Sequence, residues 1–152
     1  MSKRKFSVSV IGGHKCDARV AKLAEKIGEI IAQEGAVLVC GGLSGIMEAA
    51  CRGAKNNGGL TVGIIPGKDK EAANKFVDVV ITTGMGYSRN TLVAGTADMV
   101  VALPGEYGTL SEISFALIDN KPIYGFDTWD IDGVVKLKDV EELQKIIRDK
   151  MK

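Results

Sequence analysis

Hydrophobic positions along the chain alternate between short apolar runs and stretches of helical period. The clearest helix has an apolar stripe at three- and four-residue spacing from Val20 to Ile31, and Gly35 follows as a terminator. Further helices are predicted over residues 46–56, up to about 97, over 110–118 with Asn120 as its stop, and around 140–147. Apolar runs predict strands at residues 6–11, 36–39, 60–65, 77–81, 99–103 and 122–126, with a seventh near 134–137.

Strands that alternate with helices at this rhythm are typical of βαβ units. We therefore predict an α/β fold with a parallel sheet of about six or seven strands, helices on both faces, and a single domain over residues 1–152. Crossovers between such strands are right-handed, and ligands bind beyond the carboxyl ends of the strands. The connections that follow the strands are thus expected to share one edge of the molecule.

Composition narrows the classes of function. No apolar stretch approaches the roughly 18 residues of a membrane span, and the chain starts without the apolar segment of a signal peptide. We expect a cytoplasmic protein that does not bind membranes. The net charge is +1, and the nearest basic cluster, Lys3-Arg4-Lys5, is short and terminal. Nucleic acid is therefore not an expected partner, because its binders usually carry a basic stripe.

Cysteine and histidine are sparse. Cys16, Cys40 and Cys51 lack CxxC spacing, which indicates free, buried thiols in a reducing compartment. His14 and Cys16 lie close enough in sequence to share a metal, but the chain has no second histidine to complete a site. No metal is expected.

Many of the 19 glycines cluster in the predicted connections between a strand and the next helix, at residues 12–13, 41–45, 84–89 and 104–109. Glycine lets backbone N–H groups approach a ligand, and the helix that follows adds unpaired N–H groups and a positive dipole end. An anion, usually phosphate, is the natural occupant. The alternative is that the glycines only serve tight turns and close packing; four clusters on one edge favour ligand binding. Neither a GxGxxG motif nor a Walker lysine is present, which disfavours a classical NAD site or P-loop.

Two charged residues beside these turns are candidate functional groups. Arg89 lies near the first turn of a predicted helix, where a cation costs about 0.3–1 kcal/mol. It belongs there if it faces an anion or a buried carboxylate; the alternative is a solvated side chain. Glu112 has capping-box spacing from Thr109, so it either caps the helix or serves as a catalytic or ligand-orienting carboxylate.

Two motifs carry a family resemblance. Residues 40–49 (CGGLSGIMEA) and 104–112 (PGEYGTLSE) resemble the GGGxxGLM and PGGxGTxxE motifs of the LOG-like family, whose better-known members are cytokinin-activating phosphoribohydrolases. The GGxxG…GYxRN…GTLSE pattern is most similar to the branch related to the molybdenum-cofactor carrier. The resemblance implies a Rossmann-like fold, a homodimer, no required cofactor, and either an AMP-like nucleotide or molybdenum cofactor as ligand.

The resemblance also implies roles for individual residues. Arg89 and Glu112 match the catalytic pair of the hydrolases. The resemblance assigns the nucleotide phosphate to Gly105, Gly108 and Thr109. The other residues that we expect to bind the ligand lie in the first two glycine-rich turns or directly after them: Gly12, Gly13, Gly41, Gly42, Ser44, Gly45 and Met47. Asn90 and Glu106 depart from the hydrolase motifs, which carry lysine and glycine there.

Three functions remain open at this point. The first is hydrolysis of a nucleoside 5′-monophosphate to free base and ribose 5-phosphate. The second is non-catalytic carriage or sensing of molybdopterin or a related nucleotide, which the departures at Asn90 and Glu106 favour. The third is an assembly protein with purely structural glycines. The helix over 110–118 is apolar on more than one side, so we expect it to form a symmetric dimer contact. Lysine decarboxylation is rejected, because nothing indicates a pyridoxal phosphate lysine.

Overall fold

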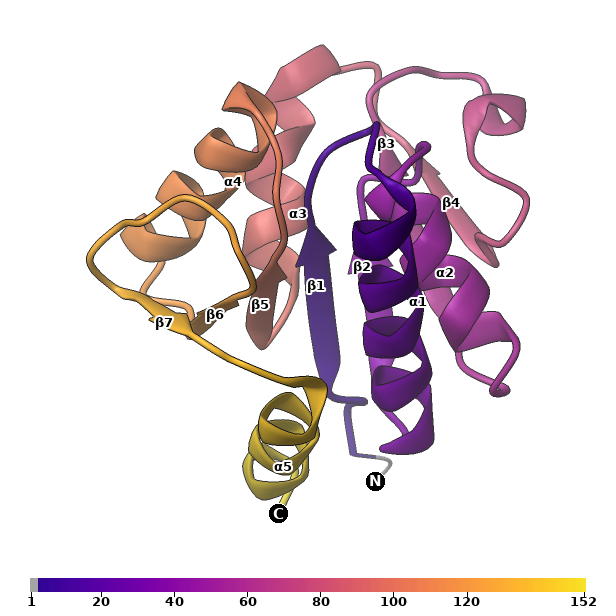
Figure 1. Ribbon diagram of the computed structural model, residues 1–152. Coiled ribbons are helices and arrows are strands. Elements are labelled where there is room, and N and C mark those ends of the chain that lie inside the picture. Colours follow the sequence, from indigo (N-terminus) through magenta and orange to yellow (C-terminus); the bar gives the residue numbers. More distant parts are fainter. Residues whose placement is uncertain (1–2) are drawn as a thin grey trace.

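The computed structural model describes residues 3–152, in which seven strands form one parallel sheet in the order β4-β3-β2-β1-β5-β6-β7 (Figure 1). Their bounds are β1 Ser7–Ile11, β2 Val37–Cys40, β3 Thr61–Ile65, β4 Val79–Thr82, β5 Met99–Ala102, β6 Ile123–Gly125 and β7 Val134–Lys136. All neighbouring strands pair in parallel. The predicted α/β fold with a Rossmann-like sheet is confirmed.

Helices cover both faces of the sheet. They are α1 Ala18–Gln33, α2 Ile46–Lys55, α3 Asn90–Thr96, α4 Tyr107–Ile118 and α5 Val140–Lys150, with short 3₁₀ turns η1 Lys70–Ala72 and η2 Gly86–Arg89. Figure 1 shows α1 and α2 on one side of β1 and α3 and α4 on the other. Alternate residues of β1 explain this: Val10 joins the core beneath α1, α2 and α5, whereas Ile11 joins the core beneath α3 and α4.

The contact between α1 and α2 depends on glycine. A Cβ on Gly53 would lie 1.9 Å from the carbonyl oxygen of Glu25, and one on Gly28 would lie 1.9 Å from that of Ala50. Gly28 and Gly53 thus permit close packing of one helix backbone on the other. The helix after β2 is thereby held firmly against the helix after β1.

Helix ends follow the sequence signals in two places. Gly35, with φ of +80°, comes just after the C-cap of α1, and Asn120, with φ of +56°, comes just after that of α4. Both adopt the left-handed conformation that ends a helix, as predicted. The strand predicted from residue 77 begins later, at Val79. Before it, the side chain of Asp78 accepts a hydrogen bond from the backbone N–H of Thr61.

The three cysteines are free thiols, but only two are buried. The Sγ atoms of Cys40 and Cys51 lie 3.5 Å apart within the core beneath α1 and α2. The prediction of burial is wrong for Cys16, which is exposed in the connection before α1. This connection runs along the surface, where a short segment without regular structure normally lies.

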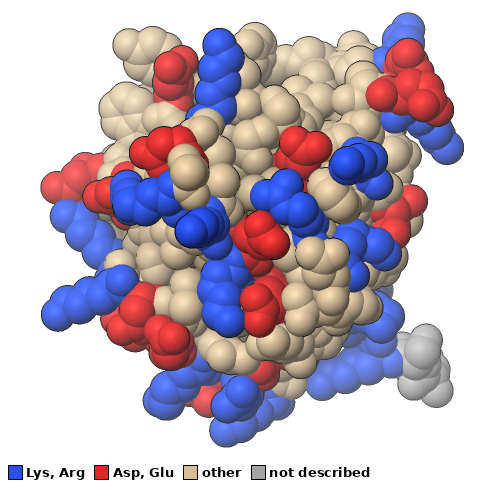
Figure 2. Space-filling view, turned by 45° about the vertical axis from the view of Figure 1, so that its right-hand side comes forward, with Lys and Arg blue, Asp and Glu red and all other residues tan. Residues whose placement is uncertain are grey.

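Acidic and basic side chains are interspersed on the face shown in Figure 2. Ion pairs link some of them, such as Arg52 with Glu25 at 3.2 Å between α2 and α1. Within residues 3–152, no helix has the length and apolar character needed to cross a membrane.

Candidate functional site

The strand order of the sheet defines one crevice. From β1 the chain first builds outward through β2, β3 and β4, and then returns to place β5 on the other side of β1. The connections after β1 and β5 therefore leave in opposite directions, and ligands of open α/β sheets bind at such a switch point. Here the two connections also touch, since the N–H of Gly13 donates to the carbonyl oxygen of Pro104 at 2.9 Å.

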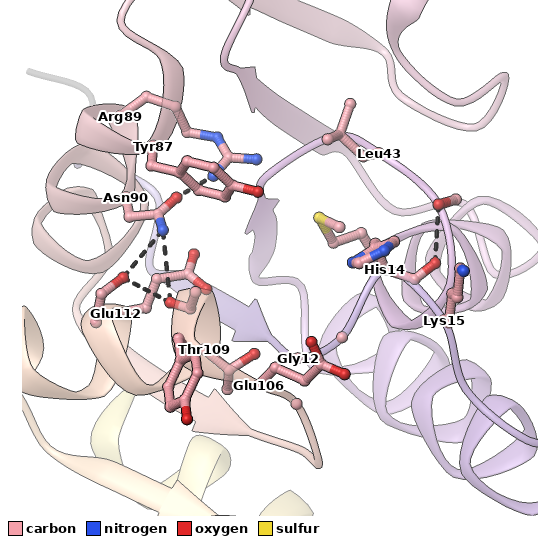
Figure 3. Close-up of a pocket in the computed structure, with 17 residues that line it drawn as sticks. Gly12, His14, Lys15, Leu43, Tyr87, Arg89, Asn90, Glu106, Thr109 and Glu112 are labelled. Atoms are coloured by element: carbon pink, nitrogen blue, oxygen red, sulfur yellow. Dashed lines mark hydrogen bonds between the residues drawn. The ribbon is translucent and has the colours of Figure 1, made fainter.

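A cavity of about 760 Å³ opens at this switch point, a size typical of small-molecule sites. It is lined by Gly12, Gly13, His14, Lys15, Leu43, Ser44, Met47, Tyr87, Arg89, Asn90, Gly105, Glu106, Tyr107, Gly108, Thr109, Ser111 and Glu112. The carboxyl ends of β1, β2 and β5 all contribute to it, together with η2 (Figure 3). Both candidate catalytic residues and most of the candidate binding residues therefore surround a single cavity.

Three of the predicted binding residues are not part of the lining: Gly41, Gly42 and Gly45. A Cβ on Gly41 would lie 2.8 Å from both Nη2 of Arg89 and Sδ of Met47. Gly45 has φ of +67°, and a Cβ there would lie 2.4 Å from the backbone of His14. These glycines shape the connection after β2 and leave room for the side chains and backbone that do face the cavity.

The connection from β5 to α4 wraps closely around Thr109. A Cβ on Gly105 would lie 2.0 Å from Oγ1 of Thr109 and 2.9 Å from the backbone nitrogen of Gly13. The helix starts at Tyr107, with Glu106 as its N-cap, so Thr109 is its third residue and is buried. The predicted capping box is therefore wrong: the helix begins three residues early, and Glu112 lies too far along it to reach the N-cap.

The starts of α2 and α4 differ from those of α1 and α5. Asp17 and Asp139 cap α1 and α5 through side-chain hydrogen bonds to backbone N–H groups. The described residues provide no such side-chain cap at Gly45 or Glu106, the N-cap positions of α2 and α4. The first turn of α4 therefore lies at the cavity without a side-chain cap for its backbone N–H groups, an arrangement suited to an anion.

Arg89 is 7% exposed and is the last residue of η2. Its Nε donates to the carbonyl oxygen of Ile64 at 2.9 Å and its Nη2 to that of Gly41 at 3.3 Å, while Nη1 donates to Oδ1 of Asn90. The solvated alternative for this side chain is wrong. Burial lowers the pKa of the guanidinium, and the opposite charge of Glu112 counteracts that shift.

Glu112 is also 7% exposed and lines the cavity from α4. Burial raises the pKa of its carboxyl group from 4.5 to about 8, against the opposing effect of Arg89. The group therefore holds its proton at neutral pH. A buried acid beside an arginine in a cavity is the kind of perturbed group that functional sites contain.

Asn90 connects Arg89 with the residues of α4 that line the cavity (Figure 3). Its Oδ1 accepts from Arg89, and its Nδ2 donates to Oγ of Ser111 at 3.0 Å and to the carbonyl oxygen of Gly108 at 3.4 Å. Ser111 in turn donates to the same Gly108 carbonyl at 2.6 Å. A neutral amide thus links the arginine to the first turn of α4, where sequence reasoning registered only a departure from a motif.

Sequence reasoning missed several other residues around the cavity. His14 and Lys15 directly follow the first glycine pair, and Tyr107 lies between two glycines of the last turn, so their position beside these turns was a usable signal. Trp129 had no such signal. It follows β6, and its Nε1 donates to the carbonyl oxygens of Gly105 at 3.1 Å and Glu106 at 3.3 Å.

The carboxylate of Glu106 is exposed at the cavity wall. Figure 3 shows it on the same side as Thr109, near Gly12. Lys15 lies on the cavity wall as well, contributed by the connection after β1. The wall therefore carries exposed charges of both signs, while the buried groups at its base are Arg89 and the protonated Glu112.

No group of three or more His, Cys, Asp or Glu side chains in residues 3–152 is arranged to hold a metal ion. The cavity instead combines glycine turns, a helix start without a side-chain cap, one buried cation and one buried acid. Together with the strand order, these features place the protein in the class of Rossmann-like α/β proteins with a switch-point site.

The chain belongs to the SLOG cluster4 family, whose family model matches residues 5–152. It is 35% identical over 127 residues to a cytokinin riboside 5′-monophosphate phosphoribohydrolase of Mycobacterium tuberculosis, covering 77% of this chain and 68% of that protein. This places it among the LOG-like proteins, as the motifs predicted.

Two solved structures are similar over nearly the whole chain. The molybdenum cofactor binding protein of Rippkaea orientalis has a TM-score of 0.92 and 34% identity, with 99% of this chain and 100% of that chain covered. The molybdenum cofactor carrier protein of Chlamydomonas reinhardtii has a TM-score of 0.87 and 29% identity, with 97% and 99% covered. Within the LOG-like proteins, the chain lies near the molybdenum-cofactor-carrier branch.

Proposed function

We propose that this protein binds a phosphate-bearing small molecule of the nucleoside 5′-monophosphate class in the switch-point cavity and cleaves its N-glycosidic bond. The observation that carries the proposal is the burial of Arg89 and Glu112 in the same cavity as the uncapped start of α4. The phosphate end of the ligand is assigned to Gly105, Gly108 and Thr109, where helix N–H groups are available.

The chemistry follows from the protonated carboxyl group of Glu112. Cleavage of AMP by water gives adenine and ribose 5-phosphate, and the departing base needs a proton. Glu112 holds one at neutral pH, because burial raises its pKa to about 8. As the bond between C1′ and the base breaks, the carboxylate faces the positive charge that develops on the ribose, as in glycoside hydrolysis. Water then forms a bond to C1′ and gives a proton back to the carboxylate. Arg89 stabilises that carboxylate by its own charge.

The test is incubation of the pure protein with AMP and chromatographic measurement of free adenine. We expect adenine from the wild type and none from the Arg89→Ala, Glu112→Gln double variant. The single Glu112→Gln variant, which keeps the shape of the side chain but lacks the acid, separates loss of chemistry from loss of binding. Adenine release no faster from the wild type than from the double variant refutes hydrolysis.

A second candidate is non-catalytic carriage of molybdenum cofactor. It is favoured by the similarity of nearly the whole chain to solved molybdenum cofactor proteins. Asn90, a neutral amide where the hydrolase motif has a lysine, favours it as well. After incubation with the cofactor and gel filtration, a carrier retains both pterin fluorescence and molybdenum. Absence of both from the protein fraction excludes this function.

A further inference from the structure

Two tyrosines of the cavity wall are unusually exposed. Tyr87 is 84% exposed and Tyr107 is 79% exposed, the highest values among the exposed large hydrophobic residues of the described chain. Tyr87 lies in η2 beside Arg89, and Figure 3 shows its ring at the cavity with the hydroxyl group directed inward. Tyr107 is the first residue of α4, between two glycines assigned to phosphate. Both tyrosines line the same cavity.

The ring of Tyr107 is supported from a second element. It stacks on Trp129, with ring centroids 6.3 Å apart and an interplanar angle of 30°. Trp129 is itself fixed by hydrogen bonds from Nε1 to the carbonyl oxygens of Gly105 and Glu106. The neighbouring Thr128 donates to the carbonyl oxygen of Leu103 at 2.9 Å. The segment after β6 therefore orients Tyr107 before any ligand arrives, which lowers the entropy lost on binding.

The cavity also has more room than a phosphate group requires. Its volume of about 760 Å³ is that of a site for a complete organic ligand. If the phosphate lies at the start of α4, the remainder of the ligand extends past the residues on either side of that turn. Tyrosine rings there offer flat π-faces, which bind planar nitrogen heterocycles by stacking.

We propose that Tyr107, supported by Trp129, and Tyr87 form a stacking site for the planar heterocycle of the ligand. The inference rests on the proposed function, because the phosphate end fixes the position of the heterocycle. It specifies the ligand further: a phosphate ester that carries a purine or pterin ring binds tightly, and a bare sugar phosphate binds weakly. Stacking of one base changes affinity by about 5- to 150-fold.

The test measures equilibrium binding by titration calorimetry in the Glu112→Gln background, which lacks the proton donor for turnover. The probes are AMP, GMP, whose guanine shares the amino-oxo-pyrimidine edge of a pterin, and ribose 5-phosphate. We expect at least one nucleotide to bind more tightly than ribose 5-phosphate. Tyr107→Ala and Tyr87→Ala are each expected to lower the affinity for that nucleotide by about 5- to 150-fold and to leave the affinity for ribose 5-phosphate unchanged. Tyr107→Phe keeps the aromatic ring and should retain the affinity for the nucleotide.

Val135→Ala is the matched control, because this side chain is also an exposed hydrophobic one but lies on β7, outside the cavity. Unchanged nucleotide affinity in both Tyr→Ala variants overturns the inference. So does an equal loss for ribose 5-phosphate, or a loss that accompanies dissociation of an oligomer in light scattering. Failure of the starting protein to bind any of the three probes refutes the proposed function itself, and this inference with it.

Discussion

Titration of Glu112 links the candidate site to the stability of the whole protein. Its carboxyl group is buried, and its pKa rises from 4.5 in the absence of the fold to about 8 within it. Between these values the folded protein holds a proton that the unfolded chain has released. The stabilisation by this bound proton is fully present below pH 4.5 and is lost as the pH rises to about 8.

The magnitude follows from the two pKa values. In this interval the free energy of unfolding falls by about 1.4 kcal/mol for each pH unit. Between pH 6 and pH 9 the expected loss is about 2–3 kcal/mol, because the slope flattens once the folded protein also releases the proton. Gln in place of Glu112 imitates the protonated form and cannot titrate. The Glu112→Gln variant is therefore expected to gain about 2–3 kcal/mol in stability relative to the wild type across this range.

The measurement is urea denaturation of both proteins at several pH values, followed by circular dichroism and by the fluorescence of Trp129, the single tryptophan. Only the difference between the two proteins is used, so that other titrating groups cancel. In an Arg89→Gln variant the loss is expected to continue to higher pH, because the arginine lowers the pKa of Glu112. A difference between wild type and Glu112→Gln that stays constant from pH 6 to pH 9 would falsify the burial of an ionisable carboxyl group.

Three further predictions concern packing, the phosphate turn and assembly. Gly53→Ala places a Cβ 1.9 Å from a carbonyl oxygen of α1, so we expect its free energy of unfolding, measured in urea, to fall by about 1–3 kcal/mol. Gly67→Ala is the control, because a Cβ there has open space, and its free energy of unfolding should stay within about 0.5 kcal/mol of the wild type. Gly105→Ala displaces Thr109 and should abolish calorimetric binding of ribose 5-phosphate while the circular dichroism spectrum is retained. Light scattering at micromolar concentration should give a mass twice the 16.1 kDa of one chain. Ile118 is an exposed hydrophobic residue of α4, with 71% of its surface accessible, so Ile118→Lys should give a monomer. A wild-type monomer refutes the dimer.

Much of the fold was predictable because its strands are buried on both faces. Each residue of β2 and β5 is buried, so these strands read as continuous apolar runs bounded by glycine or proline. The edge strand β4 was placed less accurately. Val77 is apolar because it packs into the core from the connection before β4, and a run of hydrophobic residues does not distinguish such a contact from a strand.

The part of the candidate site that could be predicted from the sequence consists of residues in the turns and helices directly after strands. Glycine turns, Arg89 and Glu112 follow strands directly, and a parallel sheet brings all strand ends to one edge. The start of α4 was not predictable. Its first two residues are Tyr107 and Gly108, neither of which signals a helix start, and the favourable N-cap residue Thr109 lies inside the helix. Local preference is overridden where backbone N–H groups are left for another purpose.

Asn90 shows why the two proposed functions are compatible with one geometry. As a neutral amide it accepts a hydrogen bond from Arg89 and donates to Ser111 and Gly108, and a lysine could do only the donating. A second cation beside the guanidinium would also favour the ionised form of Glu112 and lower its pKa. The asparagine therefore leaves the cavity with one buried positive charge and keeps the buried acid protonated at neutral pH. In both proposed functions the start of α4 would hold the phosphate of the ligand, and the functions differ in whether Glu112 transfers its proton.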